Sequence, residues 1–294
     1  MPSLANHQSN DFTKLLLIGD AKSGKTGSLI SLVEAGYKLR ILDMDNLLDI
    51  LKYMIYEKCP DKIDNVEFRT LRDKRKGTQQ GSIIDGSPKA FVDAIKMLDR
   101  WKYKDADGTE IDLGVPANWG PDCILVLDSL SRFCDSAWDF ADAMNVPGRS
   151  GEKDPRQTYG HAQDVVEQTL ATVTSSSFET NVIVIAHVSY MEIGGYVDPN
   201  TGKMVGGTLK GFPQGIGAKL SPKIPQYFPN VVLYTNEGGK RTLRTNSTPL
   251  IDLANAKPFA MQKSYPIESG LAQFFAVLRE PPKPKEAPKM VRRA

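Results

Sequence analysis

The sequence predicts an α/β fold in which a mostly parallel central sheet is covered by helices on both faces. Short runs rich in Val, Ile and Leu alternate with longer segments of helical periodicity along most of the chain. Continuous apolar runs of this kind are typical of strands that are buried on both sides. A glycine-rich turn follows the first run, and a later run ends in an aspartate. Together these observations indicate βα units around a parallel sheet.

The individual elements follow from the same alternation. Strands are expected at residues 14–19, 38–43, 66–71, 123–128, 182–187 and 230–235, with a hairpin partner for the last one near 240–245. Helices are expected at residues 24–35, 46–57, 88–101, 130–143 and 157–175. Gly36 follows the first helix at the position where a left-handed residue commonly ends a helix. The sheet is therefore expected to finish with a C-terminal β-hairpin.

Three stretches interrupt this order. Residues 72–87 are expected to form a polar loop, and residues 144–158 combine Gly, Pro and basic side chains between two helices. Residues 189–223 contain eight glycines and four lysines, and YVDPNTGKMV within them predicts a small hairpin around its Asp-Pro-Asn-Thr-Gly turn. Loops longer than about 15 residues are unusual unless they bind a ligand or move. The last two stretches are therefore candidates for binding.

Composition is that of a globular protein with a basic end. The chain has 294 residues, of which 40% are apolar and 24% charged, enough to bury a sizeable core. We expect a polar N-terminal segment at 1–12, a core at 13–277 and a Pro/Lys-rich tail at 278–294. The net charge is +2, and the last fourteen residues hold five Lys or Arg and one Glu. The tail is expected to be an extended arm that either tethers nucleic acid or keeps the protein soluble.

Neither secretion nor membrane insertion is expected from the sequence. The N-terminus is polar, and no run of 18 apolar residues occurs. The three cysteines are widely spaced and form no CxxC pair, which favours free thiols in a reducing compartment. We therefore expect a cytoplasmic protein.

The turn after the first strand matches G-x-x-x-x-G-K-[ST], the phosphate-binding loop. Glycines let successive backbone N–H groups point inward, and the following helix adds its positive end, so a polyphosphate can be held without a bulky side chain in the way. Lys25 is expected to reach the β- and γ-phosphates of ATP, and the Thr26 hydroxyl to bind Mg²⁺. The predicted nucleotide-binding residues are Gly19, Asp20, Ala21, Lys22, Ser23, Gly24, Lys25, Thr26 and Gly27.

Three further residues end predicted strands at the same edge of the sheet. Asp128 is expected to hold Mg²⁺, although it or Ser129 could instead cap the next helix. Asp45 is the preferred base for the attacking water, with helix capping by Asp45 or Asn46 as the alternative. His187 is expected to sense the γ-phosphate and to pass its presence to the glycine-rich stretch behind it, unless it is a structural histidine that points away from the crevice.

Together these residues resemble the RecA-type recombination ATPases, and most closely the small phage-encoded ATPases of that fold that are associated with single-strand annealing. The run ILVLDS is similar to the family's second nucleotide motif, and VIVIAH to the strand that ends in the γ-phosphate sensor. The segment ILDMDNLLD resembles the one that carries the catalytic acid, which places that role on Asp45, although the family usually has Glu there. The resemblance covers roughly residues 13–275 and implies a RecA-like P-loop NTPase, in the host cytoplasm if it is phage-encoded.

The resemblance also implies a nucleic-acid partner. The family binds single-stranded DNA through two mobile loops, which correspond by position to residues 144–158 and 189–223. Solvated surface loops are the alternative. Aromatic side chains that could stack on bases are Tyr190, Tyr196 and Phe212. Candidate phosphate contacts are Arg149, Lys153, Arg156, Lys203, Lys210, Lys219 and Lys223.

In such proteins a neighbouring subunit completes each active site with a cation, often from a late Lys-x-Arg pair. Lys257 occupies the first of these positions, but Phe259 stands where the arginine would be. The residues eligible for this role are therefore Lys257, Lys263, Arg241 and Arg244.

The function predicted from the sequence is a Mg²⁺-dependent ATPase of DNA recombination or repair that binds single-stranded DNA. A homo-oligomeric ring or filament is expected, with a single-strand-binding protein as a further partner. Two alternatives remain open. A P-loop kinase of a nucleoside or small molecule would place the basic stretch RDKRKG, residues 72–77, over the nucleotide. A RecA-fold helicase or DNA-packaging motor shares nearly every motif and differs in ring assembly and translocation.

Overall fold

The computed structural model describes residues 12–281 except 80, 149–150, 200 and 203. An eight-stranded sheet forms its centre, with the strand order β16-β15-β14-β1-β9-β8-β2-β3. Strands β14 to β3 in this order run parallel, and β15 and β16 are added antiparallel. The strands are β1 (Lys14–Gly19), β2 (Lys38–Asp43), β3 (Val66–Thr70), β8 (Gly120–Asp128), β9 (Thr180–Ala186), β14 (Asn230–Glu237), β15 (Lys240–Arg244) and β16 (Ser264–Pro266).

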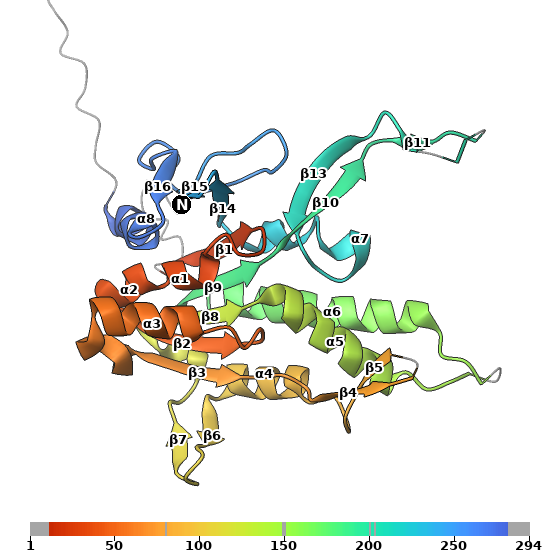
Figure 1. Ribbon diagram of the computed structural model, residues 1–294, viewed down its shortest axis with the longest axis horizontal. Helices are drawn as coiled ribbons and strands as arrows, with labels where there is room; N and C mark the ends of the chain where they lie inside the picture. The colour runs from red at the N-terminus through yellow and green to blue at the C-terminus, as the bar shows by residue number, and fades with distance from the viewer. Residues whose placement is uncertain (1–11, 80, 149–150, 200, 203, 282–294) are drawn as a thin grey trace, which may run out of the picture.

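Helices cover both faces of the sheet (Figure 1). One face packs against α4 (Ala90–Asp99), α5 (Leu130–Met144) and α6 (Pro155–Thr174). The other packs against α2 (Ile30–Glu34), which follows the short α1 (Lys25–Ser28), and against α3 (Asp49–Lys58) and α8 (Gly270–Arg279).

Successive side chains of the central strands enter opposite cores. In β1, Leu16 and Ile18 pack on the α5 side, whereas Leu15 and Leu17 pack on the α2 side. All six residues of β1 are buried. The predicted fold class, a mostly parallel sheet buried on both sides with a C-terminal hairpin, is confirmed.

The structure corrects several expected elements. The helix expected at 24–35 is divided at Leu29 into α1 and α2, and the helix expected at 46–57 begins at Asp49. The expected polar loop at 72–87 contains a hairpin, β4 (Arg75–Thr78) and β5 (Gly81–Ile84). All four residues of β4 are exposed, so no apolar alternation marks the strand. The remaining elements are the hairpin β6 (Lys102–Lys104) and β7 (Glu110–Asp112), α7 (Gly217–Leu220) and the 3₁₀ turns Pro60–Asn65, Pro116–Asn118 and Ile224–Tyr227.

A long hairpin leaves the body directly after β9. In it β10 (Val188–Ile193) pairs antiparallel with β13 (Thr208–Pro213), and β11 (Tyr196–Val197) with β12 (Met204–Val205). Figure 1 shows this arm projecting beyond the sheet. The hairpin predicted within YVDPNTGKMV is confirmed by β11 and β12.

The expectation of free thiols is also confirmed. Cys59, Cys123 and Cys134 are buried and unpaired. No helix in the described part of the chain combines the length and apolar composition that a bilayer crossing requires.

A buried lysine begins the central strand β1. Lys14 Nζ donates hydrogen bonds to the carbonyl oxygens of Phe178 at 2.6 Å and Thr180 at 2.7 Å. The same ammonium group lies 4.8 Å from the centroid of the Phe178 ring. Burial lowers the pKa of Lys14 to about 7, because the low-dielectric interior disfavours its charged form.

We expect Lys14 to make the free energy of unfolding depend on pH. The unfolded chain keeps a lysine pKa of 10.5, whereas the folded chain releases this proton near pH 7, so the unfolded state binds more protons between the two values. Stability should therefore rise with pH across this window, and this contribution should be absent from Lys14→Met. Urea unfolding of both proteins between about pH 6 and 10 measures the slope. Equal slopes would contradict the assignment.

Candidate active site

The carboxyl ends of four parallel strands bring the predicted site residues to one edge of the sheet. β9 lies between β1 and β8, and β2 pairs with the far side of β8. A cleft of about 600 Å³ opens at this edge, a volume typical of small-molecule sites. Predicted residues that line it are Lys22, Gly24, Lys25, Thr26, Gly27, Asp45, Asp128 and His187.

The loop between β1 and α1 depends on its glycines. Gly24 has a φ of 100°, in the left-handed region. A side chain there would place its Cβ 2.6 Å from Ile267 Cδ1. At Gly19 a Cβ would lie 2.8 Å from the Tyr234 carbonyl oxygen. The loop can therefore lie this close to its neighbours only without side chains at these two positions.

Lys25 folds back onto this loop. Its Nζ donates to the carbonyl oxygens of Gly19 and Asp20, both at 2.8 Å. Burial lowers the pKa of Lys25 to about 8, while the charges of Asp128, Asp20 and Asp45 act in the opposite direction. A phosphate oxygen carries full negative charge and is a stronger acceptor than these carbonyl groups. The loop thus holds the Lys25 ammonium group where a phosphate oxygen could replace the carbonyl oxygens as its hydrogen-bond acceptor.

Thr26 and Asp128 meet across the end of β9. Thr26 Oγ1 donates a hydrogen bond of 2.7 Å to Asp128 Oδ2. Burial raises the pKa of Asp128 to about 7; the Thr26 hydrogen bond opposes this shift and the charge of Asp45 adds to it. Helix α5 is capped by Ser129, whose Oγ accepts the N–H of Arg132, and the Asp128–Ser129 peptide bond is cis. Because Ser129 and not Asp128 caps the helix, the Asp128 carboxylate is left to face the loop.

This pair of oxygen ligands fits a divalent cation. A hydroxyl and a carboxylate are the hard ligands that Mg²⁺ prefers, and a cation would compensate the buried charge of Asp128. Within the described chain no three His, Cys, Asp or Glu side chains form a metal-binding group. Mg²⁺ at nucleotide sites takes most of its ligands from phosphates and water, so Thr26 and Asp128 suffice on the protein side.

The turn after β2 points Asp45 into the cleft and uses Asp43 as its support. Asp43 Oδ1 accepts a hydrogen bond from the Asn46 N–H at 2.7 Å, and Asp43 Oδ2 accepts one from the Thr70 hydroxyl of β3 at 2.8 Å. Burial raises the pKa of Asp43. Helix α3 begins at Asp49 without a side-chain cap, so the capping alternative for Asp45 and Asn46 is not what the structure shows. Asp45 lines the cleft instead.

His187 stands between Lys25 and Asp45. Its Nδ1 lies 3.5 Å from Lys25 Nζ, and its Nε2 lies 4.0 Å from Asp45 Oδ2. Burial lowers the pKa of His187, and the charge of Lys25 lowers it further. The backbone N–H of His187 donates a hydrogen bond to Ser131 Oγ at 3.1 Å, and the backbone carbonyl oxygen of His187 accepts one from the Gln214 N–H at 2.7 Å. The imidazole therefore points into the cleft while its backbone forms the base of the arm.

The cleft also has an apolar lining and one arginine. Ile50, Tyr53 and Met54 of α3 and Ile267 after β16 line it, as does Glu268, and the apolar side chains are suited to a nucleobase. Arg241 on β15 lines it as well.

Arg241 belongs to the cleft of its own chain. Its Cδ would lie 3.3 Å from a Cβ at Gly24. It forms no salt bridge with any described residue. The sequence indicates Arg241 only as a candidate for a neighbouring subunit's site, because the pattern does not reveal that its side chain reaches the phosphate loop of its own chain.

Two arginines that no motif indicates also reach Asp45. Arg132 Nε lies 3.6 Å from Asp45 Oδ1, and Arg72 Nη1 donates to the Asp45 carbonyl oxygen at 3.3 Å. Arg132 lies in the first turn of α5, just after the strand that ends in Asp128, but no local pattern shows that its side chain turns toward Asp45. The sequence indicates Arg72 only as part of the basic stretch 72–77 that a kinase would place over the nucleotide.

The predicted DNA contacts are dispersed over the loops and the arm. Lys153 Nζ pairs with Asp142 at 2.6 Å, and Lys210 Nζ with Asp252 at 3.2 Å. Arg156 and Lys219 are exposed. Two more candidates, Arg149 and Lys203, lie outside the described residues.

The two lysines predicted to complete a neighbouring subunit's active site, Lys257 and Lys263, differ in their contacts. Lys257 Nζ is occupied by the carbonyl oxygens of Val277 and Glu280, whereas Lys263 is exposed. Phe259, at the position where an arginine was sought, is fully exposed. Lys263 is thus the freer of the two candidates to reach another subunit.

A family model described as an AAA domain, AAA_24, matches residues 11–253, which is more than half of the chain. The chain belongs to this family. With the phosphate loop and sheet order described above, it is a P-loop ATPase of RecA-like fold. A search of curated proteins gives no match.

Two solved structures match this AAA_24 protein at low identity. The RadB recombinase is 12% identical, with 88% of this chain and 89% of that chain covered and a TM-score of 0.41. A prototypical ATPase from the type III secretion system of pathogenic bacteria is 10% identical, with 76% and 52% covered and a TM-score of 0.39. This chain spans about half the length of that ATPase.

We expect Gly24→Ala to abolish ATP binding and Gly36→Ala to leave it intact. Both glycines have positive φ, 100° and 92°, so each substitution should cost about 1–2 kcal/mol of stability. Only at Gly24 would the new Cβ meet another side chain; at Gly36 nothing lies within 4 Å. Titration with a fluorescent ATP analogue, beside thermal unfolding, tests this. An equal loss of binding in both variants would show that backbone strain, not the shape of the loop, is responsible.

Arg241→Ala should weaken ATP binding by at least about tenfold, because a hydrogen bond to a charged group contributes about 1.5–3 kcal/mol. Arg244→Ala is the control, since Arg244 lies on the same strand and pairs with Glu237 at 3.4 Å. The titration is repeated over a range of protein concentrations. A defect that persists at the lowest concentration identifies a residue of the same chain; wild-type affinity there would refute this role.

Proposed function

We propose that this P-loop ATPase is a Mg²⁺-dependent enzyme of DNA recombination or repair that binds single-stranded DNA. We further propose that it is phage-encoded and acts in single-strand annealing. The observation that carries the catalytic part is the 2.7 Å hydrogen bond from Thr26 to Asp128, with Lys25, Asp45 and His187 lining the same cleft. Such a set supplies a cation, metal ligands, a base and a γ-phosphate contact, the parts that phosphoryl transfer requires.

Hydrolysis would begin with a water molecule between Asp45 and the γ-phosphate. Asp45 accepts a proton as the water oxygen bonds to the γ-phosphorus and the bond to the β–γ bridging oxygen breaks, which yields ADP and phosphate. Lys25 stabilises the charge on the transferring group, and Arg132 holds Asp45 from the other side, 3.6 Å from its carboxylate. Thr26 and Asp128 would hold Mg²⁺, which would compensate charge on the phosphate oxygens.

His187 would connect the nucleotide to the arm. A lowered pKa keeps its imidazole neutral near pH 7, so it can exchange a hydrogen bond with Lys25 for one with the γ-phosphate. Its backbone is bonded to Gln214 where β13 ends. Any shift of the ring is therefore transmitted to both strands at the base of the arm.

The DNA-binding part of the proposal places single-stranded DNA on residues 144–158 and on the arm. Arg156 and Lys219 are exposed cations, and Tyr190 and Tyr196 are exposed aromatic rings on the arm. The basic tail adds an electrostatic tether. A homo-oligomeric ring or filament, a single-strand-binding protein as partner and the host cytoplasm as location complete the proposal.

A P-loop kinase is the second candidate, and one observation favours it. The stretch 72–77 comes close to Asp45, where Arg72 donates to the backbone, and beside it lies a cavity lined by Arg72, Arg75 and Arg132. A phosphate acceptor could enter there. The two candidates differ in where the γ-phosphoryl group goes, to water or to a small molecule.

ATP turnover with and without single-stranded DNA tests the proposal. We expect DNA to accelerate phosphate release, and Lys25→Ala and Asp45→Asn to lower turnover by about 100-fold or more, because each removes a transition-state interaction. Asp49→Asn is the matched control, an exposed carboxylate in the first turn of α3. His187→Ala should bind ATP but lose the response to DNA. Transfer of labelled phosphate to a small acceptor, with turnover indifferent to DNA, would establish the kinase instead.

A further inference from the structure

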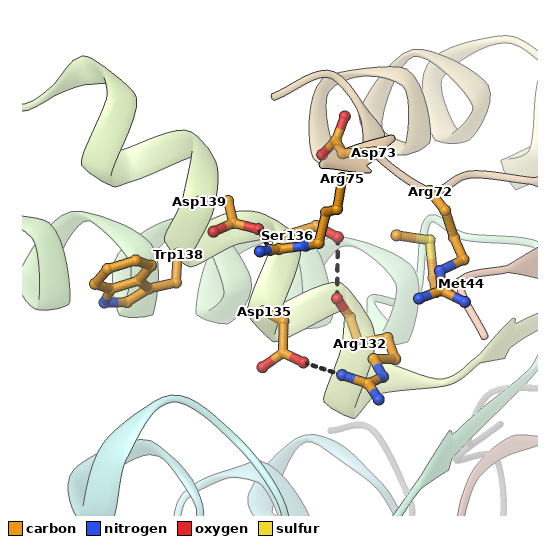
Figure 2. A pocket seen from close by; sticks show the side chains of 9 residues that line it. All are labelled: Met44, Arg72, Asp73, Arg75, Arg132, Asp135, Ser136, Trp138 and Asp139. Atoms are coloured by element: carbon orange, nitrogen blue, oxygen red, sulfur yellow. Dashed lines mark hydrogen bonds and ion pairs between the residues drawn. The ribbon is translucent and has the colours of Figure 1, made fainter. Parts of the chain in front are cut away.

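A second cavity adjoins the nucleotide cleft behind Asp45. It has a volume of about 370 Å³ and lies between the segment after β3 and the outer side of α5 (Figure 2). The two spaces share a wall, because Arg132 lines this cavity and also contacts the Asp45 carboxylate, and Arg72 lines it and donates to the Asp45 carbonyl oxygen. Whatever occupies this cavity therefore lies one side chain away from the catalytic base.

Three guanidinium groups line the cavity, from Arg72, Arg75 and Arg132, together with three carboxylates, from Asp73, Asp135 and Asp139. Asp73 is engaged by backbone N–H groups at the start of α4. Arg75 Nη2 pairs with Asp139 at 2.5 Å, and Arg132 Nη1 pairs with Asp135 at 3.0 Å. Both arginines are about half exposed, and ion pairs at the protein surface contribute little to stability. An incoming phosphate, which matches the fork of a guanidinium, can displace them at little cost.

An aromatic ring lies at the other end of the cavity. Trp138 lines it and is 36% exposed, although tryptophan usually avoids solvent. Its ring contacts Tyr159 edge to face, with 6.4 Å between centroids, and Tyr159 is exposed as well. Figure 2 shows Trp138 at the end of the cavity opposite Arg72 and Met44. An exposed ring close to guanidinium groups is the arrangement with which proteins bind a base and its phosphate.

We propose that this cavity binds single-stranded DNA, with a phosphodiester on Arg75 and Arg72 and a neighbouring base stacked on Trp138. The inference rests on the proposed function and adds a contact surface separate from the loop 144–158 and the arm. It also gives DNA a direct route to the catalytic base. A phosphate that recruits Arg132 alters the contact of its guanidinium with Asp45 and so changes the rate of hydrolysis.

Binding of a fluorescent oligodeoxythymidine, followed by anisotropy in the presence of a non-hydrolysable ATP analogue, tests the proposal. Trp138→Ala should weaken binding about tenfold, the size of one base–aromatic stack. Arg75→Ala should lower the slope of log K against log salt by about 0.7, the share of one phosphate contact on a single strand. Asp139→Asn removes the competing carboxylate and should tighten binding. Arg100→Ala is the control, because Arg100 is similarly exposed and pairs with Asp112 near the β6–β7 hairpin.

The response of ATP turnover gives a second readout. Trp138→Ala should keep the basal rate and lose most of the acceleration by DNA, because Trp138 touches the cavity and not the nucleotide cleft. Thermal unfolding confirms that each variant is folded. Wild-type DNA affinity and an unchanged salt slope in both Trp138→Ala and Arg75→Ala would overturn the proposal, while DNA-stimulated turnover in the wild type would leave the proposed function standing.

Tryptophan fluorescence identifies the occupant. The chain has three tryptophans, of which Trp101 is fully buried, Trp119 is partly buried and Trp138 is exposed. Trp101 and Trp119 are present in both proteins, so the difference between wild type and Trp138→Phe isolates the Trp138 signal. Quenching by the oligonucleotide that is lost in Trp138→Phe supports the proposal. Quenching by a nucleoside monophosphate or inorganic phosphate, with none by the oligonucleotide, would overturn it in favour of a small phosphorylated acceptor. Failure of the wild type both to bind DNA and to be stimulated by it would refute the proposed function itself.

Discussion

The hydrogen bond between Thr26 and Asp128 depends on the parallel register of the central strands. Thr26 follows β1 and Asp128 ends β8, with β9 between them. Because β1 and β8 run the same way and end at the same edge of the sheet, the loop and helix that follow β1 meet the end of β8, and Thr26 of α1 comes within 2.7 Å of Asp128. The same register brings the turn after β2 to this edge, where the Met44 N–H bonds to the Asp128 carbonyl oxygen at 2.6 Å. The cleft is thus a property of the sheet rather than of any one loop.

Burial leaves the charged groups at this edge poorly compensated. It lowers the pKa of Lys25 and raises that of Asp128, so both groups hold their charge less firmly than they would in water. A triphosphate would compensate the first and a divalent cation the second. The folded protein alone does not provide these compensating charges, whereas the bound ligands would. The site is therefore suited to bind a triphosphate and a divalent cation together. Asp43, by contrast, is satisfied by hydrogen bonds from within the protein and acts as support.

Much of this arrangement could be predicted from the sequence because it is marked by continuous apolar runs and a specific motif. The central strands, the phosphate loop and the meeting of Asp45, Asp128 and His187 at one edge follow from them. The hairpin β4–β5 could not be predicted, since all four residues of β4 are exposed and its sequence has no alternation of apolar and polar residues. Arg132 and Arg241 escaped for another reason. Their roles depend on the direction of a side chain and on which strand lies beside the loop, and neither is written in local periodicity.

The arm formed by β10 and β13 starts directly after His187, whose side chain lies in the cleft. β10 contains six residues and is therefore about 20 Å long. A rotation of about 10° at its base would move its far end by about 3 Å, close to the advance of one residue along a strand. A rotation at the base that is too small to disturb the packing of the sheet can thus move the far end of the arm by about the length of one residue of an extended chain. Stiffness, rather than flexibility, is what would make such an arm useful.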